Sequence, residues 1–326
     1  MLVAPIKLRG DLLTMAEHGL DPRSLIGNSG VSYEEILAKR PISCEAMSDV
    51  YAHVIAKAPA DFALSCGQSI RLQYMGSLGY RLSNCATVGE LLADWVRYSG
   101  NIGYPLVGSL KVAGDRWRMT FVPRFPMSPH AEEFCVTSTL AGFAKSVLNL
   151  SGHRISMRRI GFSNPAPEDS DSYLALAAEV TFGCPAPFVE GDREDLDRPI
   201  ATADADLLQA CEDLCQREWS QENSRVTERL YALFGLKGVV TLADASKHMG
   251  MSQRSLQRNL SMEGSGYTGV LDDYRHRRAL VLLQQGRCSK SIAFELGFDH
   301  DSSFRRSFRG WTGVSVSEWR KDRVSV

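Results

Sequence analysis

The C-terminal part of the sequence contains one short pattern twice, and this repeat constrains the fold more than any other feature. In each copy a small residue precedes a glycine by four positions: Ser246 and Gly250 in the first, Ala293 and Gly297 in the second. A glycine can turn the chain through a left-handed conformation, and small residues let two helices pack closely. Each copy therefore predicts a helix, a tight turn and a second helix.

The first copy, about residues 242–261, predicts a helix-turn-helix whose second helix exposes polar side chains. Ser252 suits the cap position of that helix, and Leu256 and Leu260 form its inward stripe. The outward positions are Gln253, Arg254, Gln257 and Arg258. Arginine pairs with guanine and glutamine with adenine through two hydrogen bonds each, so this face has the chemistry to contact base edges.

The second copy, about residues 289–309, repeats the arrangement. Asp299 is expected to cap its second helix, and Phe304 and Phe308 face inward. The remaining polar positions are Asp301, Ser302, Arg305, Arg306 and Arg309. Arginine and serine also bind phosphates, so the same face suits a DNA backbone.

One long helix, Leu271 to Gln284, is predicted between the two copies. Its Arg275, Arg277 and Arg278 are expected to add positive charge along the route. Two exposed helices tied by a rigid helix predict contacts with successive major grooves, roughly 34 Å apart. The alternative is that the arginines are a solvated face and the glycines are ordinary helix ends, a weaker account when both copies occur together.

The charge distribution supports a polyanionic partner. The chain has 37 Lys and Arg against 38 Asp and Glu, a net charge of −1. Residues 236–326 hold 15 basic and 9 acidic residues, a net +6, so residues 1–235 carry −7. This asymmetry predicts a basic module that contacts nucleic acid and an acidic module that does not.

The stretch 223–323 resembles the DNA-binding domain of AraC-type transcriptional regulators, through Leu296-Gly297-Phe298, Ser303-Phe304-Arg305-Arg306 and Trp311-Thr312-Gly313. The resemblance implies base-contacting positions at Arg254, Gln257, Arg258, Asp301, Ser302, Ser303 and Arg306. Three positions depart from the family pattern. Ser246 replaces alanine, Val316 replaces proline, and Ser289 replaces an apolar residue, so the first helix of the second unit is expected to pack less firmly.

Residues 1–203 predict an α+β domain because helical and strand patterns are interleaved. The main expected helices are Leu8 to His18, Cys44 to Ala58, Thr87 to Ser99 and Ala131 to Leu150. The main expected strands are Leu106 to Val112, Arg116 to Val122 and Ile155 to Phe162. Capping boxes are predicted at Ser32 with Glu35 and at Thr87 with Glu90.

Other segments of this region are less regular. A helix is expected near Tyr173 to Ala178, and proline-rich residues 183–199 are expected to form a loop and an edge strand. Residues 204–220 form a predicted helical connection, covering Ala205 to Trp219, and residues 221–326 the DNA-binding domain, opened by a helix from Asn223 to Phe234. The fold class is therefore an α+β sensor domain followed by an all-α double helix-turn-helix domain.

The N-terminal region resembles the arabinose-binding-type effector domain of one AraC subgroup, through Leu78-Gly79-Tyr80, Ala86-Thr87-Val88-Gly89-Glu90 and Phe162-Ser163-Asn164-Pro165. The resemblance implies sensing of a small metabolite and dimerisation, and it leaves the effector-binding residues unknown. Aromatic and basic residues between 71 and 98 would suit a pocket for an anionic or amphipathic molecule, or ordinary packing. They are Arg71, Tyr74, Trp95, Arg97 and Tyr98.

No catalytic motif, cofactor motif or zinc-finger spacing occurs, so neither an enzyme nor a metal or cofactor site is expected. Cys211 and Cys215, four residues apart, would suit a redox pair or half a metal site, with buried free thiols as the alternative. A thiol-based redox regulator, or a DNA-repair enzyme with an activated cysteine, therefore stays open as an alternative function. No cysteine has the Pro-Cys-His-Arg setting that the repair chemistry requires.

Together these features predict a sequence-specific DNA-binding regulator, an activator by family resemblance, controlled by a small-molecule effector. The expected partners are double-stranded DNA, the effector and RNA polymerase, with the chain as a homodimer. The sequence has no export signal and no apolar run of the ~18 residues that span a membrane. The expected location is the cytoplasm, at the nucleoid.

Overall fold

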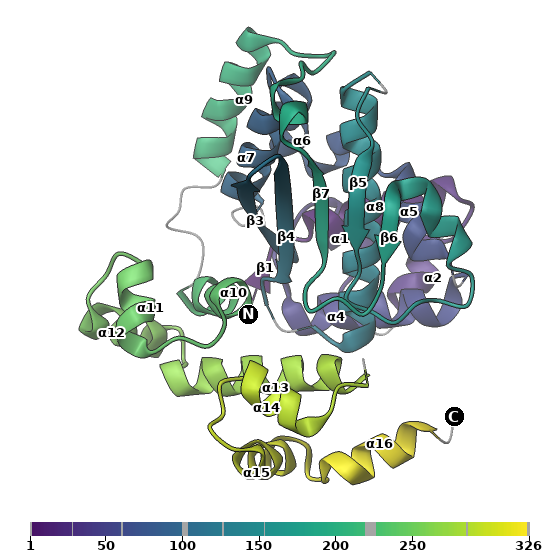
Figure 1. Cartoon of the computed structure of the whole chain (residues 1–326). Helices are drawn as coiled ribbons and strands as arrows, with labels where there is room; N and C mark the ends of the chain where they lie inside the picture. The colour runs from purple at the N-terminus through teal and green to yellow at the C-terminus, as the bar shows by residue number, and fades with distance from the viewer. Residues whose placement is uncertain are drawn as a thin grey trace. The chain divides into compact units, whose positions relative to one another are not determined.

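A computed structural model of the chain divides into two compact units, Met1–Ser224 and Arg225–Val326, which are described separately (Figure 1). None of the helices in the described part of the chain is long and apolar enough to cross a membrane. The structure describes residues 2–27, 29–59, 61–99, 104–125, 127–152, 154–218, 226–284 and 286–324.

The N-terminal unit contains a five-stranded sheet with the order β3-β4-β7-β5-β6. Neighbouring strands are antiparallel except β5 and β6, which are parallel. A two-stranded antiparallel pair, β1 (Leu2–Val3) and β2 (Ile42–Ser43), lies apart from it. The strands of the larger sheet are β3 (Leu106–Ala113), β4 (Arg116–Pro123), β5 (Met157–Gly161), β6 (Ala177–Thr181) and β7 (Phe188–Asp192).

Helices supply the rest of this unit: α7 packs against β3 and α8 against β7. Gly67 and Gly142 let α5 and α8 approach closely, because a Cβ on Gly67 would lie 2.4 Å from the Ser138 carbonyl oxygen. The helices are α1 (Ile6–Glu17), α2 (Pro22–Ile26), α3 (Tyr33–Leu37), α4 (Cys44–Lys57), α5 (Phe62–Ser69), α6 (Ser77–Asn84), α7 (Val88–Tyr98), α8 (Pro129–Leu150) and α9 (Ala205–Glu218). Three short 3₁₀ turns are η1 (Leu72–Met75), η2 (Asp171–Leu176) and η3 (Arg193–Asp197).

Two predictions for residues 173–199 are wrong. The expected helix from Tyr173 to Ala178 is the short turn η2 followed by β6, because residues from Ala177 onward find backbone partners beside β5. The expected edge strand is β7, which lies in the middle of the sheet between β4 and β5. An acidic Glu190 is tolerated there because Arg118 pairs with it at 2.7 Å and neutralises its charge.

The predicted caps have mixed outcomes. At Ser32 the capping box is confirmed, with reciprocal hydrogen bonds between Ser32 and Glu35. At Thr87 the hydroxyl accepts the Glu90 N–H, but the Glu90 carboxylate accepts from Ala86 N–H and not from Thr87. The second box is therefore only half formed.

Helix α9 packs against α6, so up to Glu218 the segment predicted as a connection is part of the N-terminal unit. Residues 219–225, which include the expected end of that helix and the start of the next, lie outside the described residues.

In its described residues, the C-terminal unit is all helical and has two hydrophobic cores. The first contains Leu230, Phe234, Leu256 and Leu260, and the second contains Phe304 and Phe308. Helix α13 contributes its first half to one core and its second half to the other. The helices are α10 (Val226–Lys237), α11 (Leu242–His248), α12 (Gln253–Met262), α13 (Tyr267–Gln284), α14 (Ser289–Glu295), α15 (Asp301–Thr312) and α16 (Val316–Val324). The predicted fold class, α+β followed by an all-α double helix-turn-helix, is confirmed.

Candidate nucleic-acid interface and sensor core

The first helix-turn-helix consists of α11 and α12. Gly250 has a φ of +66°, the left-handed turn that the sequence predicts. The Ser252 hydroxyl accepts the Ser255 N–H at 3.1 Å and caps α12. Ser246 is buried, and its hydroxyl donates to the Ala243 carbonyl at 2.8 Å, so the serine that replaces the usual alanine keeps its polar group satisfied.

Helix α12 presents one apolar and one polar face. Leu256 and Leu260 are fully buried. The predicted base-contacting side chains are all exposed: Gln253, Arg254, Gln257 and Arg258. None of these four has an ion pair or a side-chain hydrogen bond with any described part of the chain. Their hydrogen-bond donors and acceptors are therefore available to a molecule that binds at this face of the helix.

The second helix-turn-helix consists of α14 and α15, with Gly297 at a φ of +68°. The prediction that Asp299 caps α15 is wrong: the cap residue is His300, and it makes no side-chain cap hydrogen bond. Because α15 begins at Asp301, the Asp299 carboxylate is one position too early to reach the free amides. Asp301 itself supplies a negative charge to the first turn, which the helix dipole favours.

Helix α15 repeats the division into two faces, with Phe304 and Phe308 fully buried. Four of the predicted side chains are exposed and have no side-chain partner among the described residues: Ser302, Ser303, Arg306 and Arg309. The other two predicted residues pair with each other, since Arg305 Nη2 lies 2.7 Å from Asp301 Oδ2. Arg305 also donates to Ser289 Oγ at 3.1 Å, which links α15 to α14.

The three arginines of α13 all have protein partners, and Arg277 pairs with Asp273 on the surface of the same helix at 3.2 Å. Arg275 donates to the carbonyls of Leu296 and Gly297, both at 2.9 Å, and its guanidinium stacks over Phe298. Arg278 pairs with Glu295 at 3.0 Å. Arg275 therefore holds the turn of the second unit, a role that no sequence signal indicated because the contact spans 21 residues.

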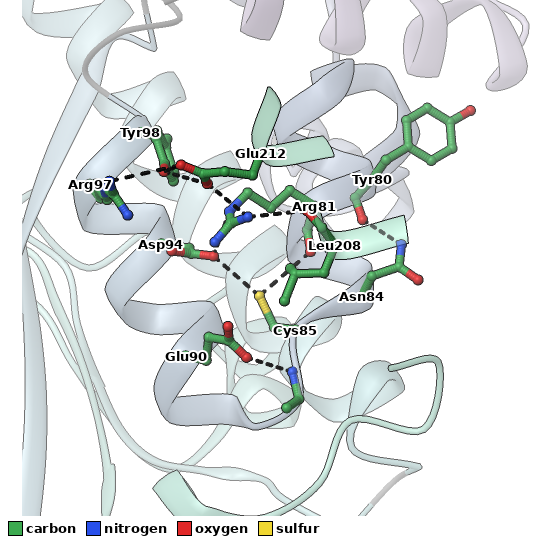
Figure 2. Close-up of polar contacts among 11 residues, drawn as sticks. Tyr80, Arg81, Asn84, Cys85, Glu90, Asp94, Arg97, Tyr98, Leu208 and Glu212 are labelled. Atoms are coloured by element: carbon green, nitrogen blue, oxygen red, sulfur yellow. Dashed lines mark hydrogen bonds and ion pairs between the residues drawn. The ribbon is translucent and has the colours of Figure 1, made fainter. Parts of the chain in front are cut away.

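The aromatic and basic residues noted between 71 and 98 lie in three different settings. Tyr74 and Trp95 line a cavity in the N-terminal unit. Tyr98 donates to both Glu212 oxygens, at 2.8 and 2.6 Å, and Arg97 lies 3.9 Å from the same carboxylate (Figure 2). Arg71 pairs with Glu17 at 3.2 Å. The five residues therefore do not line one common pocket, and of the two alternatives that the sequence left open only Tyr74 and Trp95 follow the first.

A buried polar cluster joins α6, α7 and α9 (Figure 2). Arg81 Nε lies 2.7 Å from Asp94 Oδ2, and Arg81 Nη1 lies 2.8 Å from Glu212 Oε2. Burial raises the pKa of Asp94, while Arg81 opposes the rise. The Cys85 thiol donates to the Arg81 carbonyl and to Asp94 Oδ2, both at 3.5 Å, and burial raises the pKa of that thiol.

The ligand atoms of Cys85, Glu90 and Asp94 lie within 4.8 Å of one another, a spacing that would suit a metal ion. Burial favours the protonated form of the Cys85 thiol by raising its pKa, and the Asp94 carboxylate already has a cation, Arg81, beside it. Groups of the protein itself therefore supply the hydrogen-bond and charge partners of Cys85, Glu90 and Asp94.

Cys211 and Cys215 are both buried in α9. Burial raises the pKa of both thiols, that of Cys215 to about 12. A redox-sensing cysteine needs an accessible thiolate and a lowered pKa, so this environment opposes the redox alternative.

Comparisons with known proteins agree with this architecture. The family described as the arabinose-binding domain of AraC transcription regulator, N-term, matches residues 19–200, and a helix-turn-helix domain family matches residues 245–322. The ornithine utilization regulator of Pseudomonas aeruginosa is 30% identical over 278 residues, covering 83% of this chain and 81% of that protein. The regulator VqsM of the same organism is 36% identical over 81 residues, 24% of this chain and 25% of that protein.

Among solved structures, the transcriptional regulator CdpR from Pseudomonas aeruginosa is similar over 97% of this chain and 98% of that chain, with 21% sequence identity and a TM-score of 0.49.

Two helix-turn-helix units behind a mixed α/β domain define a DNA-binding transcriptional regulator with an N-terminal effector-binding domain. The chain belongs to the AraC family of transcription regulators, in the group with an arabinose-binding-type N-terminal domain.

Proposed function

We propose that this regulator activates transcription and that its DNA affinity or its presentation to RNA polymerase is controlled by a small molecule bound in the N-terminal unit. The observation that carries the proposal is the polar face of α12 and of α15, each exposed after a left-handed glycine. A helix in this position enters the major groove with its exposed side chains against base edges.

In this proposal the side chains without protein partners contact bases. Arg254 and Arg306 pair with guanines, and Gln257 pairs with adenine, because these pairings satisfy two hydrogen bonds at once. The other proposed contacts, to bases or phosphates, are Gln253, Arg258, Ser302, Ser303 and Arg309. Asp301 and Arg305 already bind each other, so their contribution is smaller than that of Arg306.

Effector control follows from linkage: a ligand that binds one arrangement of the N-terminal unit more tightly shifts the population toward that arrangement. A homodimer would place two copies on a promoter, and the cytoplasm, at the nucleoid, is the compartment where these partners meet. A regulator named for ornithine utilization is among the relatives, which supports control by a metabolite. The activating role is favoured by the family resemblance and is tested by transcription in vitro with purified RNA polymerase.

Selection of duplexes from a random library by the full chain tests the DNA-binding proposal. We expect enriched sequences with two conserved elements whose centres lie about 10–10.5 base pairs apart, one helical turn. Enrichment of a single element would contradict the use of both units. Retention of DNA without any enriched sequence would contradict sequence-specific recognition.

A further inference from the structure

A cavity of about 40 Å³ lies in the N-terminal unit, lined mainly by residues of α1, η1, α7 and α8. Most of its wall is apolar and includes the rings of Trp95 and Phe143, whose centroids lie 6.3 Å apart in an edge-to-face arrangement. Other apolar lining residues are Ile6, Ile70, Leu72, Leu82, Leu91 and Val147. Such a wall suits the ring or hydrocarbon part of a small molecule.

The charge at this cavity is already balanced. Lys7 lines it, and its ammonium donates to both carboxylate oxygens of Asp11 at 2.9 Å and to Ser138 Oγ at 2.8 Å, which uses all three of its protons. Lys7 is 4% exposed and Asp11 is fully buried, so the pair is a neutral unit inside the protein. A carboxylate ligand would have to displace Asp11 and would leave an uncompensated buried charge, and a cationic ligand would find no free carboxylate.

The polar capacity left for a ligand is small. Ser138 Oγ accepts from Lys7 and donates to the Phe134 carbonyl at 2.7 Å, so it is occupied. The hydroxyls of Tyr104 and Thr139 lie 3.3 Å apart and share one hydrogen bond. Only one of their two protons can lie between them, so the pair can offer a ligand one further proton. Ser146 adds a hydroxyl to the lining of this cavity.

We propose that this cavity is the effector site and that it accepts a small uncharged molecule with one aromatic or alicyclic ring and one hydroxyl or carbonyl group. The proposal rests on effector control of the regulator, as argued above. The ring packs against Trp95 and Phe143, and the polar group bonds to the Tyr104–Thr139 pair. A free sugar is a poor occupant, because its hydroxyls point in all directions and most would be buried against apolar side chains.

The cavity must widen to hold a ring, because small-molecule sites in proteins usually measure about 300–1,000 Å³. The wall that can yield is η1: Leu72 and Tyr74 are only partly buried, and η1 ends at Gly76, which has a φ of +65°. Helix α6 begins at the next residue, so an outward shift of η1 would reach Arg81 and its contact with α9.

Binding of four matched probes to the full chain tests the ligand class: benzyl alcohol, benzoate, benzylamine and L-arabinose. The readout is the ¹⁹F signal of 5-fluorotryptophan at position 95, assigned with Trp95→Phe. We expect benzyl alcohol to shift this signal with a Kd on the order of 1 mM. Benzoate and benzylamine should bind at least about tenfold more weakly, since they bury a charge, and arabinose should produce no saturable shift.

Two variants locate the site. Ser146→Leu fills the cavity and should weaken the binding of benzyl alcohol at least about tenfold. Asn149→Leu changes an exposed position on the same helix and should leave the affinity for benzyl alcohol unchanged. The double variant Tyr104→Phe/Thr139→Val removes both hydroxyls of the pair, and we expect about fivefold weaker binding of benzyl alcohol with unchanged binding of toluene. This selective effect separates lost hydrogen bonding from misfolding.

The proposal is overturned by tighter binding of benzoate or arabinose than of benzyl alcohol, by no saturable shift with benzyl alcohol, or by an affinity that Ser146→Leu does not change. Duplex selection by the same preparation keeps the two proposals apart. If duplexes are enriched but benzyl alcohol does not bind, only the proposed ligand class is rejected. If benzyl alcohol binds but no duplex sequence is enriched, only the proposed sequence-specific DNA recognition is rejected.

Discussion

Arg81 lies between two carboxylates of different helices, 2.8 Å from Glu212 on α9 and 2.7 Å from Asp94 on α7 (Figure 2). Its guanidinium also donates to the Leu208 carbonyl at 3.3 Å and lies over the Tyr98 ring. Arg81 therefore holds α9, the last described helix before the DNA-binding unit, against α6 and α7 of the same unit.

Replacing Arg81 with methionine should destabilise the N-terminal unit by about 3 kcal/mol, because the buried Asp94 and the partly buried Glu212 would lose their shared cation. Urea unfolding of the full chain, followed by tryptophan fluorescence, measures this change. Arg97→Met is the matched control. Arg97 is largely exposed and lies 3.9 Å from the same Glu212, so its loss should cost less than about 1 kcal/mol. Equal costs for the two variants would show that Arg81 does not hold the cluster together.

Arg254→Ala and Arg306→Ala should each weaken binding to a selected duplex by about 1–3 kcal/mol and relax the preference at one base position. Both side chains are exposed and without protein partners in the described structure, so their removal should not disturb folding. Fluorescence anisotropy on the selected duplex and on an unrelated duplex measures the difference. Lys237→Ala, which removes one exposed charge from α10, serves as control. The same loss on both duplexes would assign the arginines to phosphates and not to bases.

Gly250→Ala and Gly297→Ala should both destabilise the C-terminal unit, by about 1–2 kcal/mol for the left-handed backbone alone. Gly297→Ala should cost more, because its new Cβ would lie 3.2 Å from Val239 Cβ, whereas Gly250 faces open space. Thermal unfolding followed by circular dichroism ranks the two variants. A larger cost at Gly250 would contradict the close approach at Gly297.

The C-terminal unit should lose stability as the pH falls below about 6.5, the ordinary pKa of histidine. Burial and the neighbouring Arg277 lower the pKa of His276, with Asp273 opposing them, and the ring stacks on Trp311. A lowered folded-state pKa means that the unfolded chain binds the proton more readily, so stability is full above the unfolded pKa and declines below it. Unfolding temperatures measured between about pH 5 and 8 should show this decline, and His276→Gln should reduce it. An unchanged decline in the variant would assign it to other groups.

Local patterns in the sequence were sufficient to predict the two helix-turn-helix units of the DNA-binding domain. The glycines at 250 and 297, the Ser252 cap and the inward residues of α12 and α15 lie within a few positions of one another, and the structure has each of them as predicted. The prediction that Asp299 caps α15 was wrong by one position, since the cap residue is His300. The first residue of a helix depends on how the preceding turn ends.

The sequence patterns did not predict contacts between residues far apart in the chain. The prolines and acidic residues of 183–199 suggested an edge strand, and the arginines of the neighbouring strands, Arg118 and Arg159, make the central position of Glu190 tolerable. The sequence predicted Arg275 to be a free positive charge near DNA. In the structure its guanidinium donates to the turn carbonyls of the second unit. The five aromatic and basic residues between 71 and 98 suited either a pocket or ordinary packing, and the fold places Tyr98 against Glu212 of α9 and Trp95 at the cavity.

The sequence by itself determined the fold class, the two helix-turn-helix units and the side chains that face outward from them. These properties follow from helix periodicity and turn chemistry, which act over a few residues. Only the tertiary structure decided which arginines are free, where Arg81 and Glu212 meet, and which groups enclose a neutral cavity. Those properties depend on contacts between residues as far apart as Lys7 and Ser138, whose separation of 131 positions leaves no periodic signal in the chain.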